Sequence, residues 1–443
     1  MMHDQPVPDT ALCRPLRIAM LSLHSSPIGA LGSRDTGGMS VYVRELSRAL
    51  GARGDRVDIY TQGTSTATHT VTLYENVRLV YLSIGARDEI PKQALYPHIN
   101  LFYEQLEAFR RSERLRYDLI HSHYWLSGWL GLRAQKTWHV PHAMTFHTLG
   151  AVKNMVGVQP PESPQRIAAE QILCRHCTAI IVGSRREARY LEQLYKTAPQ
   201  QIFIIPCGVN RDRFYRKDRQ GARKRLGFTA SERIVLYVGR LDPLKGACQL
   251  IEVLGHLKNV NNVRLVIVGG GAENEGEKAA LEQQAQCLQV HDRVRFAGRV
   301  DQTELPLYYS AADVVAVPSQ YESFGLVMLE ALSCGTPVVA MPVGAAEEII
   351  QNPVAGAIIQ DGSLRTFAHA IARFLENGKA APENEIMRRA SVARYDWRLI
   401  AARIRAVYQR LIALGRYGWM ISDQLPAYPV ACEPPALVCD RLL

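Results

Sequence analysis

The stretch Pro318-Ser-Gln-Tyr-Glu-Ser-Phe-Gly-Leu-Val-Met-Leu-Glu-Ala-Leu-Ser-Cys-Gly335 joins a predicted strand to a predicted helix. The short β-branched run at 313–318 is typical of a buried parallel strand. From Gly325 to Ser333 the sequence predicts a helix that is apolar on nearly all sides, so we expect it to be buried. Its only charged residue is Glu330, and burying a lone carboxylate is costly unless something pairs with it.

Two interpretations of Glu330 are open. It either reaches solvent or an arginine at the edge of the helix, or it accepts hydrogen bonds from the hydroxyls of a bound ribose or polyol. Glu322, eight positions earlier, favours the second interpretation, because the free amides of Phe324, Gly325 and Leu326 follow it. Such amides at a helix start, at the carboxyl end of a parallel strand, bind anions. A phosphate bound there, with hydroxyl groups held by a carboxylate on either side of it, matches the chemistry of a nucleotide-sugar.

The segment 321–340, YESFGLVMLEALSCGTPVVA, also resembles a known family. Its Glu-x7-Glu spacing, Phe-Gly pair and closing Gly-Thr-Pro are similar to the donor-site signature of the retaining family-4 glycosyltransferases of GT-B fold. The resemblance covers about residues 16–415. It implies an α/β protein with two Rossmann-like, doubly wound parallel-sheet domains that face each other across a cleft. Predicted strands and helices alternate in both halves of the chain, as such sheets require.

This pattern predicts the domain organisation. We expect a flexible N-terminus at 1–14, an acceptor-binding domain at 15–207 and a donor-binding domain at 208–394. The charged stretch 211–225 is interpreted as the linker into the second domain. The resemblance implies that the amphipathic segment 395–416 is a terminal helix that crosses back onto the first domain. Residues 417–443 form a tail to which the sequence assigns no role.

Composition and charge limit the classes of partner. The chain has 443 residues, of which 47% are hydrophobic and 21% charged, with a net charge of +10. A basic chain can bind nucleic acid or a membrane surface, but no nucleic-acid motif accompanies the charge, so we expect no nucleic-acid partner. The excess charge is explained by phosphate-rich ligands and a solvated helix face, and much of it lies in eight C-terminal arginines: Arg388, Arg389, Arg394, Arg398, Arg403, Arg405, Arg410 and Arg416.

The cysteines and apolar runs predict a cytoplasmic protein. Nine cysteines are scattered, as in a reduced compartment. Cys174 and Cys177 form a CxxC inside a helical pattern without a second pair, which argues against a zinc or redox site. The first apolar run, 16–23, is too short for a signal peptide, and no stretch approaches the roughly 20 apolar residues of a membrane span.

The expected donor site draws on two further loops. Arg240 and Lys245 follow a predicted strand, and two cations on one loop can clamp a diphosphate and stabilise its departure. The resemblance implies that role for this loop, and it also places Arg299 in the donor site. Gly37 and Gly38 precede a predicted helix, where glycine lets backbone amides approach an oxyanion. Glu330 would hold the ribose hydroxyls, and Glu322 the transferred sugar.

In the first half, two runs carry the chemistry: His121-Ser-His-Tyr-Trp-Leu-Ser-Gly128 and Thr145-Phe-His-Thr-Leu-Gly-Ala-Val-Lys-Asn154. The resemblance implies that His147 lies against the donor sugar near the reacting carbon. It also implies a same-face displacement, in which the leaving phosphate accepts the proton of the incoming hydroxyl. The segment near His147 offers no isolated carboxylate of the sort that a double displacement needs. The expected catalytic residues are therefore His147, Arg240, Lys245 and Glu322.

The sequence also bears on which acceptor receives the sugar. Segments 21–46, 121–128, 146–154 and 161–166 are most similar to the enzymes that glycosylate inositol phosphate in the mycothiol pathway, followed by the sucrose-phosphate synthases. The resemblance implies an acceptor-phosphate site at Lys92, Tyr124, Thr148 and Arg166, with His147 beside it. Arg34-Asp35 is closer to the sucrose-phosphate pattern, so inositol phosphate and fructose 6-phosphate both stay open.

We therefore expect an enzyme that moves a hexosyl unit from a UDP-sugar to a phosphorylated acceptor. No Asp-x-Asp triplet is present, so no metal or other cofactor is expected beyond the UDP-sugar substrate. Three alternatives are a lipid glycosyltransferase in weak contact with a membrane surface, a nucleotide-sugar epimerase of the same fold, and a non-enzymatic nucleotide-sugar sensor. The sequence does not decide between a monomer and a homodimer, between UDP and another nucleotide, or which sugar is transferred.

Overall fold

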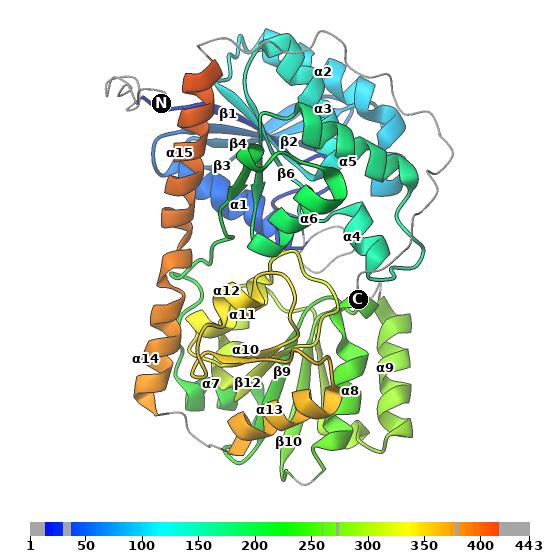
Figure 1. The fold of residues 1–443 in the computed structure, drawn as a ribbon, viewed down its shortest axis with the longest axis vertical. Coiled ribbons are helices and arrows are strands. Elements are labelled where there is room, and N and C mark those ends of the chain that lie inside the picture. The colour runs from blue at the N-terminus through cyan, green and yellow to red at the C-terminus, as the bar shows by residue number, and fades with distance from the viewer. Residues whose placement is uncertain (1–13, 30–36, 259, 272–273, 377–380, 416–443) are drawn as a thin grey trace.

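The chain folds into two α/β lobes stacked along the long axis of the molecule (Figure 1). The computed structural model describes residues 14–29, 37–258, 260–271, 274–376 and 381–415. Each lobe is built around one sheet, and helices cover both faces of each sheet (Figure 1). Two sheets of this kind confirm the predicted fold class.

The first sheet has eight strands in the order β3-β4-β2-β1-β5-β6-β7-β8. All neighbours are parallel except β3 and β4, which pair antiparallel. The strands are β1 (Arg17–Leu21), β2 (Arg56–Gly63), β3 (His69–Tyr74), β4 (Val77–Ser83), β5 (Leu119–His123), β6 (His142–Thr145), β7 (Ala179–Val182) and β8 (Ile202–Ile204). The helices of this lobe are α1 (Gly38–Gly51), α2 (Ile99–Ser112), α3 (Tyr124–Trp138), α4 (Gly150–Met155), α5 (Pro164–His176) and α6 (Arg185–Tyr195).

The second sheet has six parallel strands in the order β11-β10-β9-β12-β13-β14. They are β9 (Arg233–Val238), β10 (Val263–Val268), β11 (Val294–Gly298), β12 (Val314–Val317), β13 (Val338–Ala340) and β14 (Gly356–Ile358). The remaining helices are α7 (Arg219–Leu226), α8 (Ala247–His256), α9 (Glu275–Cys287), α10 (Leu305–Ala311), α11 (Leu326–Ser333), α12 (Ala346–Ile349), α13 (Leu364–Glu376), α14 (Pro382–Ser391) and α15 (Trp397–Gly415).

Helix α15 returns from the second lobe and runs along the side of the first (Figure 1). Its buried residues, among them Ile400, Ile404 and Tyr408, share one hydrophobic cluster with β1 and α1. The Tyr408 hydroxyl lies 2.6 Å from Nδ1 of His121 on β5. Apolar burial and this polar contact together tie the C-terminal helix to the first sheet.

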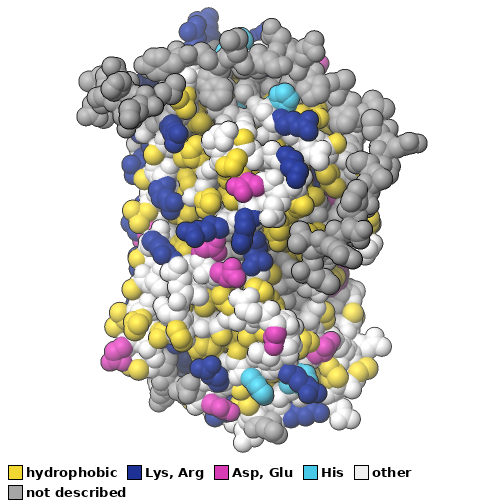
Figure 2. All heavy atoms as spheres, in the orientation of Figure 1, with side chains coloured by type: hydrophobic (Ala, Val, Ile, Leu, Met, Phe, Trp, Pro, Cys, Tyr) yellow, Lys and Arg dark blue, Asp and Glu magenta, His cyan; other side chains and the backbone are white. Residues whose placement is uncertain are grey.

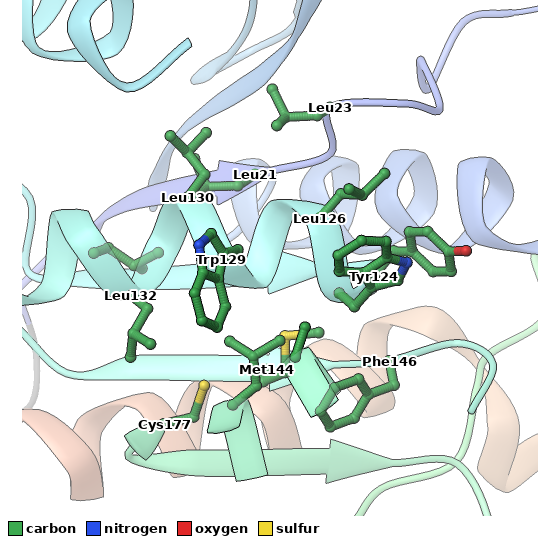
Figure 3. Close-up of a cluster of buried hydrophobic side chains, with 14 of the residues drawn as sticks. Leu21, Leu23, Tyr124, Leu126, Trp129, Leu130, Leu132, Met144, Phe146 and Cys177 are labelled. Carbon is green, nitrogen blue, oxygen red and sulfur yellow. The ribbon is translucent and has the colours of Figure 1, made fainter. Parts of the chain in front are cut away.

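Helix α3 forms much of the core on the other face of the first sheet (Figure 3). Its apolar residues occur on nearly all sides, which is typical of a buried helix. Leu126, Trp129 and Leu130 pack with Leu21 of β1 and Met144 of β6 (Figure 3). This packing fixes the start of α3, which lies at the carboxyl end of β5.

Two predictions about charged segments are wrong. The supposed linker 211–225 contains the start of a helix, α7. The C-terminal arginines are not one solvated face: Arg388 is 4% exposed, and Arg405 donates to both carboxylate oxygens of Asp55, at 3.1 and 2.9 Å. A guanidinium with a long aliphatic stem can be buried when oxygen atoms accept from it, which a composition count does not reveal. Arg416 lies outside the described residues.

Candidate active site

The predicted site residues come from the carboxyl ends of strands in both sheets. In the first sheet, Tyr124 follows β5 and His147 follows β6 closely. In the second sheet, Arg240 follows β9 and Glu322 follows β12. Loops at the carboxyl ends of parallel strands are the usual ligand sites of doubly wound sheets.

The donor-side loops 240–246 and 318–322 are held together by their backbones. The amide of Gln320 donates to the carbonyl of Leu244 at 2.8 Å. Gly246 has φ +76°, and a Cβ there would lie 2.6 Å from the carbonyl oxygen of Pro318. Only glycine fits such a close approach at positive φ, so the glycine sets the spacing of the two loops.

That spacing brings Lys245 and Glu322 together. The Lys245 ammonium lies 2.7 Å from Oε1 of Glu322, and the Ser319 hydroxyl donates to the same oxygen at 3.0 Å. Arg240 contacts Asp242 at 3.4 Å, and the Tyr237 hydroxyl donates to the carbonyl of Arg240 at 2.6 Å. Each predicted diphosphate cation thus already has a carboxylate neighbour, in half-exposed surroundings where such pairs are weak and exchangeable.

Glu330 is buried on α11, as predicted, with 7% of its surface exposed. Its carboxyl group has a partner that neither interpretation named, because the Tyr309 hydroxyl of α10 donates to Oε2 at 2.7 Å. Burial raises the pKa of Glu330 to about 7, while Tyr309, Arg213 and Arg44 act to lower it. The carboxyl group is therefore poised between its neutral and ionised forms near neutral pH.

The space beside Glu330 is small. The cavity lined by Glu330, Glu45, Arg213, Leu326 and Trp397 measures about 10 Å³. That is roughly the volume that one water molecule needs, far less than a ribose. A nucleotide can reach Glu330 only if these side chains, which come from both lobes, move apart.

Of the other predicted donor residues, Gly38, Gly325 and Leu326 lie at the start of α11, and the rest do not present a side chain there. Gly38 lies close to the start of α11, since a Cβ on it would be 3.6 Å from Cδ1 of Leu326, and Gly325 precedes that helix with φ +98°. Phe324, in contrast, is 5% exposed and packs against Gly183 of the first lobe, so only its backbone can face a donor. Arg299 is exposed just after the edge strand β11. Gly37 precedes α1, and Arg34-Asp35 lies outside the described residues.

The loop that carries Glu322 also docks on the first lobe. The Ser323 hydroxyl donates to the carbonyl of His147. Tyr321, two residues earlier, packs against the first lobe's hydrophobic core. The loop after β12 and the loop after β6 are thus in direct contact, so the two lobes touch at His147.

His147 belongs to a buried histidine chain. Its Nε2 lies 2.9 Å from Nδ1 of His123, and the His123 ring lies 4.2 Å from that of His121. Nε2 of His123 is buried without a hydrogen-bond partner among the described residues. A buried acceptor without a partner costs less free energy than a buried N–H without one, so we leave Nε2 of His123 unprotonated. The proton of the His123–His147 hydrogen bond is then on Nδ1 of His123. His147 then carries its own proton on Nδ1.

Burial keeps these rings neutral. It lowers the pKa of His147 to about 3 and the pKa of His123 well below its usual value. A neutral His147 can donate or accept a hydrogen bond but brings no positive charge to the site. His147 and Tyr124 also have positive φ, +61° and +73°, in which a bulky residue is strained.

Three of the four predicted acceptor-phosphate residues meet around Arg166. Its Nη2 donates to both oxygens of Thr148 at 2.9 Å, and its guanidinium lies 4.9 Å from the centre of the Tyr124 ring. The Tyr124 hydroxyl points away from the hydrophobic cluster (Figure 3). Arg166 is only 2% exposed, and it binds Glu170 and Glu162, both at 2.8 Å. Its charge is therefore largely committed within the protein.

His24 is a site residue that the sequence prediction missed. It follows β1, and its ring centre lies 4.4 Å from that of Tyr124. Burial lowers its pKa to about 3, and Lys92, His147 and Arg166 lower it further. That electrostatic influence places the fourth predicted residue, Lys92, in the same neighbourhood. Nδ1 of His24 is buried without a hydrogen-bond partner among the described residues.

The described part of the chain bears on the metal, redox and membrane predictions. No three His, Cys, Asp or Glu side chains in it come together as metal ligands would. Cys174 and Cys177 are free thiols whose burial raises their pKa values. Among the helices of the described ranges, none combines the length and apolar character needed to cross a membrane.

Comparison with known proteins gives the family. Residues 36–213 match the family model for Glycosyltransferase Family 4, and residues 218–391 match that for Glycosyl transferases group 1. A D-inositol 3-phosphate glycosyltransferase from Xylanimonas cellulosilytica is 36% identical over 88% of this chain and 96% of its own. The chain belongs to the family-4 glycosyltransferases.

Two further relatives support this assignment. A D-inositol 3-phosphate glycosyltransferase from Mycobacterium sp. strain KMS is 36% identical over 95% of this chain and 93% of its own. A sucrose-phosphate synthase structure from Thermosynechococcus elongatus superposes with a TM-score of 0.82, at 33% identity over 90% of this chain and 100% of that one. The predicted GT-B fold and the predicted enzyme class, a hexosyltransferase, are confirmed.

Proposed function

We propose that this glycosyltransferase moves a hexosyl group from a UDP-sugar to inositol phosphate, with retention of configuration at the sugar carbon. The observation that carries the proposal is the meeting of Tyr124, Thr148 and Arg166 with His24 on one side of the cleft. On the other side, Lys245 and Glu322 stand beside the start of α11. The two ligands would therefore lie between the lobes.

On the donor side, we propose that the diphosphate binds the α11 amides, Arg240 and Lys245. Lys245 would exchange its contact with Glu322 for one with phosphate, which frees the Glu322 carboxylate for sugar hydroxyls. Fixed cations at the leaving diphosphate stabilise the charge that develops as the glycosidic bond breaks. The ribose hydroxyls would donate to Glu330 once the narrow space beside it opens.

At the reacting carbon, the incoming hydroxyl would attack from the face that the diphosphate leaves. The departing phosphate oxygen would take the hydroxyl proton, since a His147 kept neutral with Nε2 engaged by His123 is a poor base. His147 instead would donate from Nδ1 to a sugar hydroxyl. This role orients the sugar without adding a charge.

We further propose that the reaction needs no metal ion, because Arg240 and Lys245 supply the positive charge at the diphosphate. Turnover should be unchanged after dialysis against EDTA. A loss of turnover that added Mg²⁺ or Mn²⁺ restores would contradict this proposal. We place the reaction in the cytoplasm, where UDP-sugars are made.

Fructose 6-phosphate is the second candidate acceptor. A sequence similarity favours it: the sucrose-phosphate synthase is 33% identical to this chain, close to the 36% of the inositol-phosphate enzymes. Both acceptors carry a phosphate, so the cluster around Arg166 fits either one.

A UDP-release assay tests the proposal. The enzyme is incubated with UDP-glucose or UDP-N-acetylglucosamine and with D-inositol 3-phosphate, fructose 6-phosphate, or their unphosphorylated forms. We expect UDP release with inositol phosphate that exceeds release with the other acceptors. Faster release with fructose 6-phosphate would favour the second candidate. Product formed only on lipid vesicles, or C4 epimerisation of the donor without an acceptor, would contradict both.

A further inference from the structure

A second cavity lies at the opposite end of the second sheet from the cleft. Its volume is about 280 Å³, close to the lower limit of roughly 300 Å³ for small-molecule sites. Asp313, Pro337 and Val354, which line it, come directly or shortly before β12, β13 and β14. The donor residues follow their strands instead, so the whole sheet separates the two places.

Arginine dominates the charge of this cavity. Four arginines line it, Arg216, Arg219, Arg373 and Arg388, against two carboxylates, those of Asp313 and Glu385. We call it the arginine cavity. Asp313 is shared between Arg219 and Arg223, and Glu385 pairs with Arg216 at 2.9 Å. Both carboxylates are thus already paired with arginines, and the cavity keeps an excess of positive charge.

Arg388 gives the strongest indication of a ligand. It is 4% exposed, and its Nε and Nη1 donate to the carbonyls of Val354, at 2.7 Å, and Gly335, at 3.2 Å. Within the described residues no carboxylate pairs with it. Carbonyls orient a guanidinium but do not neutralise it, and a buried charge without a counter-charge is costly. Burial lowers the pKa of Arg388 and the nearby Arg216 lowers it further, against the opposing effect of the Glu385 carboxylate, which is paired with Arg216.

Arg373 and the apolar lining of the arginine cavity indicate which kind of ligand it can hold. Arg373 on α13 is exposed and lines the cavity, so it is accessible to a ligand. Phe374 and Pro353 add apolar surface. Planar guanidinium groups bind phosphate oxygens in bidentate fashion, more tightly than they bind a single carbonyl.

We propose that the arginine cavity is a second anion-binding site, which takes a phosphate group that is either free or carried by a small phosphomonoester. The anion supplies the negative charge that Arg388 lacks, and Arg373 closes over it from the exposed side. The site is independent of the proposed reaction and of the UDP-sugar site. Its ligand therefore binds without any turnover.

Calorimetric titration of the full chain tests this proposal, with inorganic phosphate and glycerol 3-phosphate as separate probes. Because phosphate can also bind in the cleft, the comparison is between variants. Arg373→Glu should weaken phosphate binding at the arginine cavity at least tenfold, whereas Arg365→Glu, an exposed arginine on the same helix outside the cavity, should change it less than twofold. The tighter of the two probes identifies the free or the esterified phosphate as the preferred form.

Two controls keep the result decisive. UDP affinity should be equal in the wild type, Arg373→Glu and Arg365→Glu, because UDP binds elsewhere. Arg388→Lys, which keeps the charge but loses the planar fork, should weaken phosphate binding in a protein that still binds UDP. Identical phosphate isotherms for the wild type and Arg373→Glu, or equal weakening by Arg365→Glu, would overturn the proposal.

Discussion

The two sides of the cleft hold their charges differently. On the donor side, the Lys245 and Glu322 side chains are 23% and 16% exposed, and those of Arg240 and Asp242 are 41% and 32% exposed. On the acceptor side, the Arg166 and Glu170 side chains are 3% and 0% exposed. Exposed pairs are weak, whereas breaking a buried pair leaves an uncompensated charge.

Because of this difference, we expect substitutions on the two sides to have different effects on turnover and on stability. Donor-side pairs can release their partners to a ligand at little cost, so changes there should affect turnover and leave the fold intact. The acceptor side is built in advance, so changes there should affect the fold as well as the ligand. Figure 2 shows one face of the molecule, on which Lys and Arg side chains lie among Asp, Glu and hydrophobic ones.

The largest expected effect is on stability and comes from Arg166→Ala. Removing one member of a buried ion pair costs about 3–5 kcal/mol, because Glu170 is left buried without its counter-charge. Denaturant unfolding should show this loss. Arg175→Ala, an exposed arginine on the same helix, is the matched control and should cost less than about 0.5 kcal/mol. Wild-type stability in Arg166→Ala would mean that the acceptor side is not prebuilt.

The next effect is on turnover and comes from Lys245→Ala. It removes a charge-assisted contact worth about 1.5–3 kcal/mol, so UDP release should slow about ten- to hundredfold while the unfolding free energy changes little. Lys258→Ala, an exposed lysine of the same lobe, should have no effect. If Lys245→Ala kept full turnover, the assignment of this loop to the diphosphate would be wrong.

The smallest effect is the pH dependence of UDP binding. The pKa of Glu330 is raised to about 7, so the ionised fraction rises from about one tenth at pH 6 to about nine tenths at pH 8. Ribose hydroxyls favour the ionised form, so UDP affinity should rise roughly tenfold over this range. Glu330→Gln should abolish this component and leave only the titration of the UDP phosphate itself. Equal pH profiles for both proteins would refute the ribose role.

The same carboxyl group affects stability with the opposite sign. The folded protein holds the Glu330 proton up to about pH 7, whereas the unfolded chain releases it near its ordinary value. The unfolded state thus binds fewer protons in between, so the ligand-free protein should lose stability as the pH rises through that window, by at most about 3 kcal/mol. Glu330→Gln should flatten this dependence in thermal unfolding.

The local structure around Glu322 and Glu330 was predictable from sequence, because the strand, the loop and the helix concerned are contiguous. Strand 314–317, the glycine before α11, Glu322 and Glu330 lie within one short stretch whose periodicity and spacing carry the information. The sequence pattern also predicts a helix at 164–176, a strand at 263–268 and a helix at 364–376, and these are the bounds of α5, β10 and α13. Strand β3 was missed because its residues are mostly exposed and polar, so no hydrophobic pattern marks it.

The partners on the acceptor side were not predictable in the same way. The residues Lys92, Tyr124, Thr148 and Arg166 were found only through family resemblance, and His24, Glu162 and Glu170 were not found at all. These side chains come from distant segments that meet only in the folded protein. A buried ion pair such as Arg166–Glu170 looks like an ordinary surface pair at helical spacing, since the sequence does not show which face is covered.

A crystal structure with UDP bound would test the central claim most directly. The account predicts that the lobes separate enough to admit the nucleotide, that both ribose hydroxyls lie within hydrogen-bond distance of Glu330, and that the diphosphate contacts Lys245 and Arg240. UDP bound away from Lys245 and Arg240, or a ribose out of reach of Glu330 while Tyr309 keeps its hydrogen bond to the Glu330 carboxyl group, would contradict this expectation.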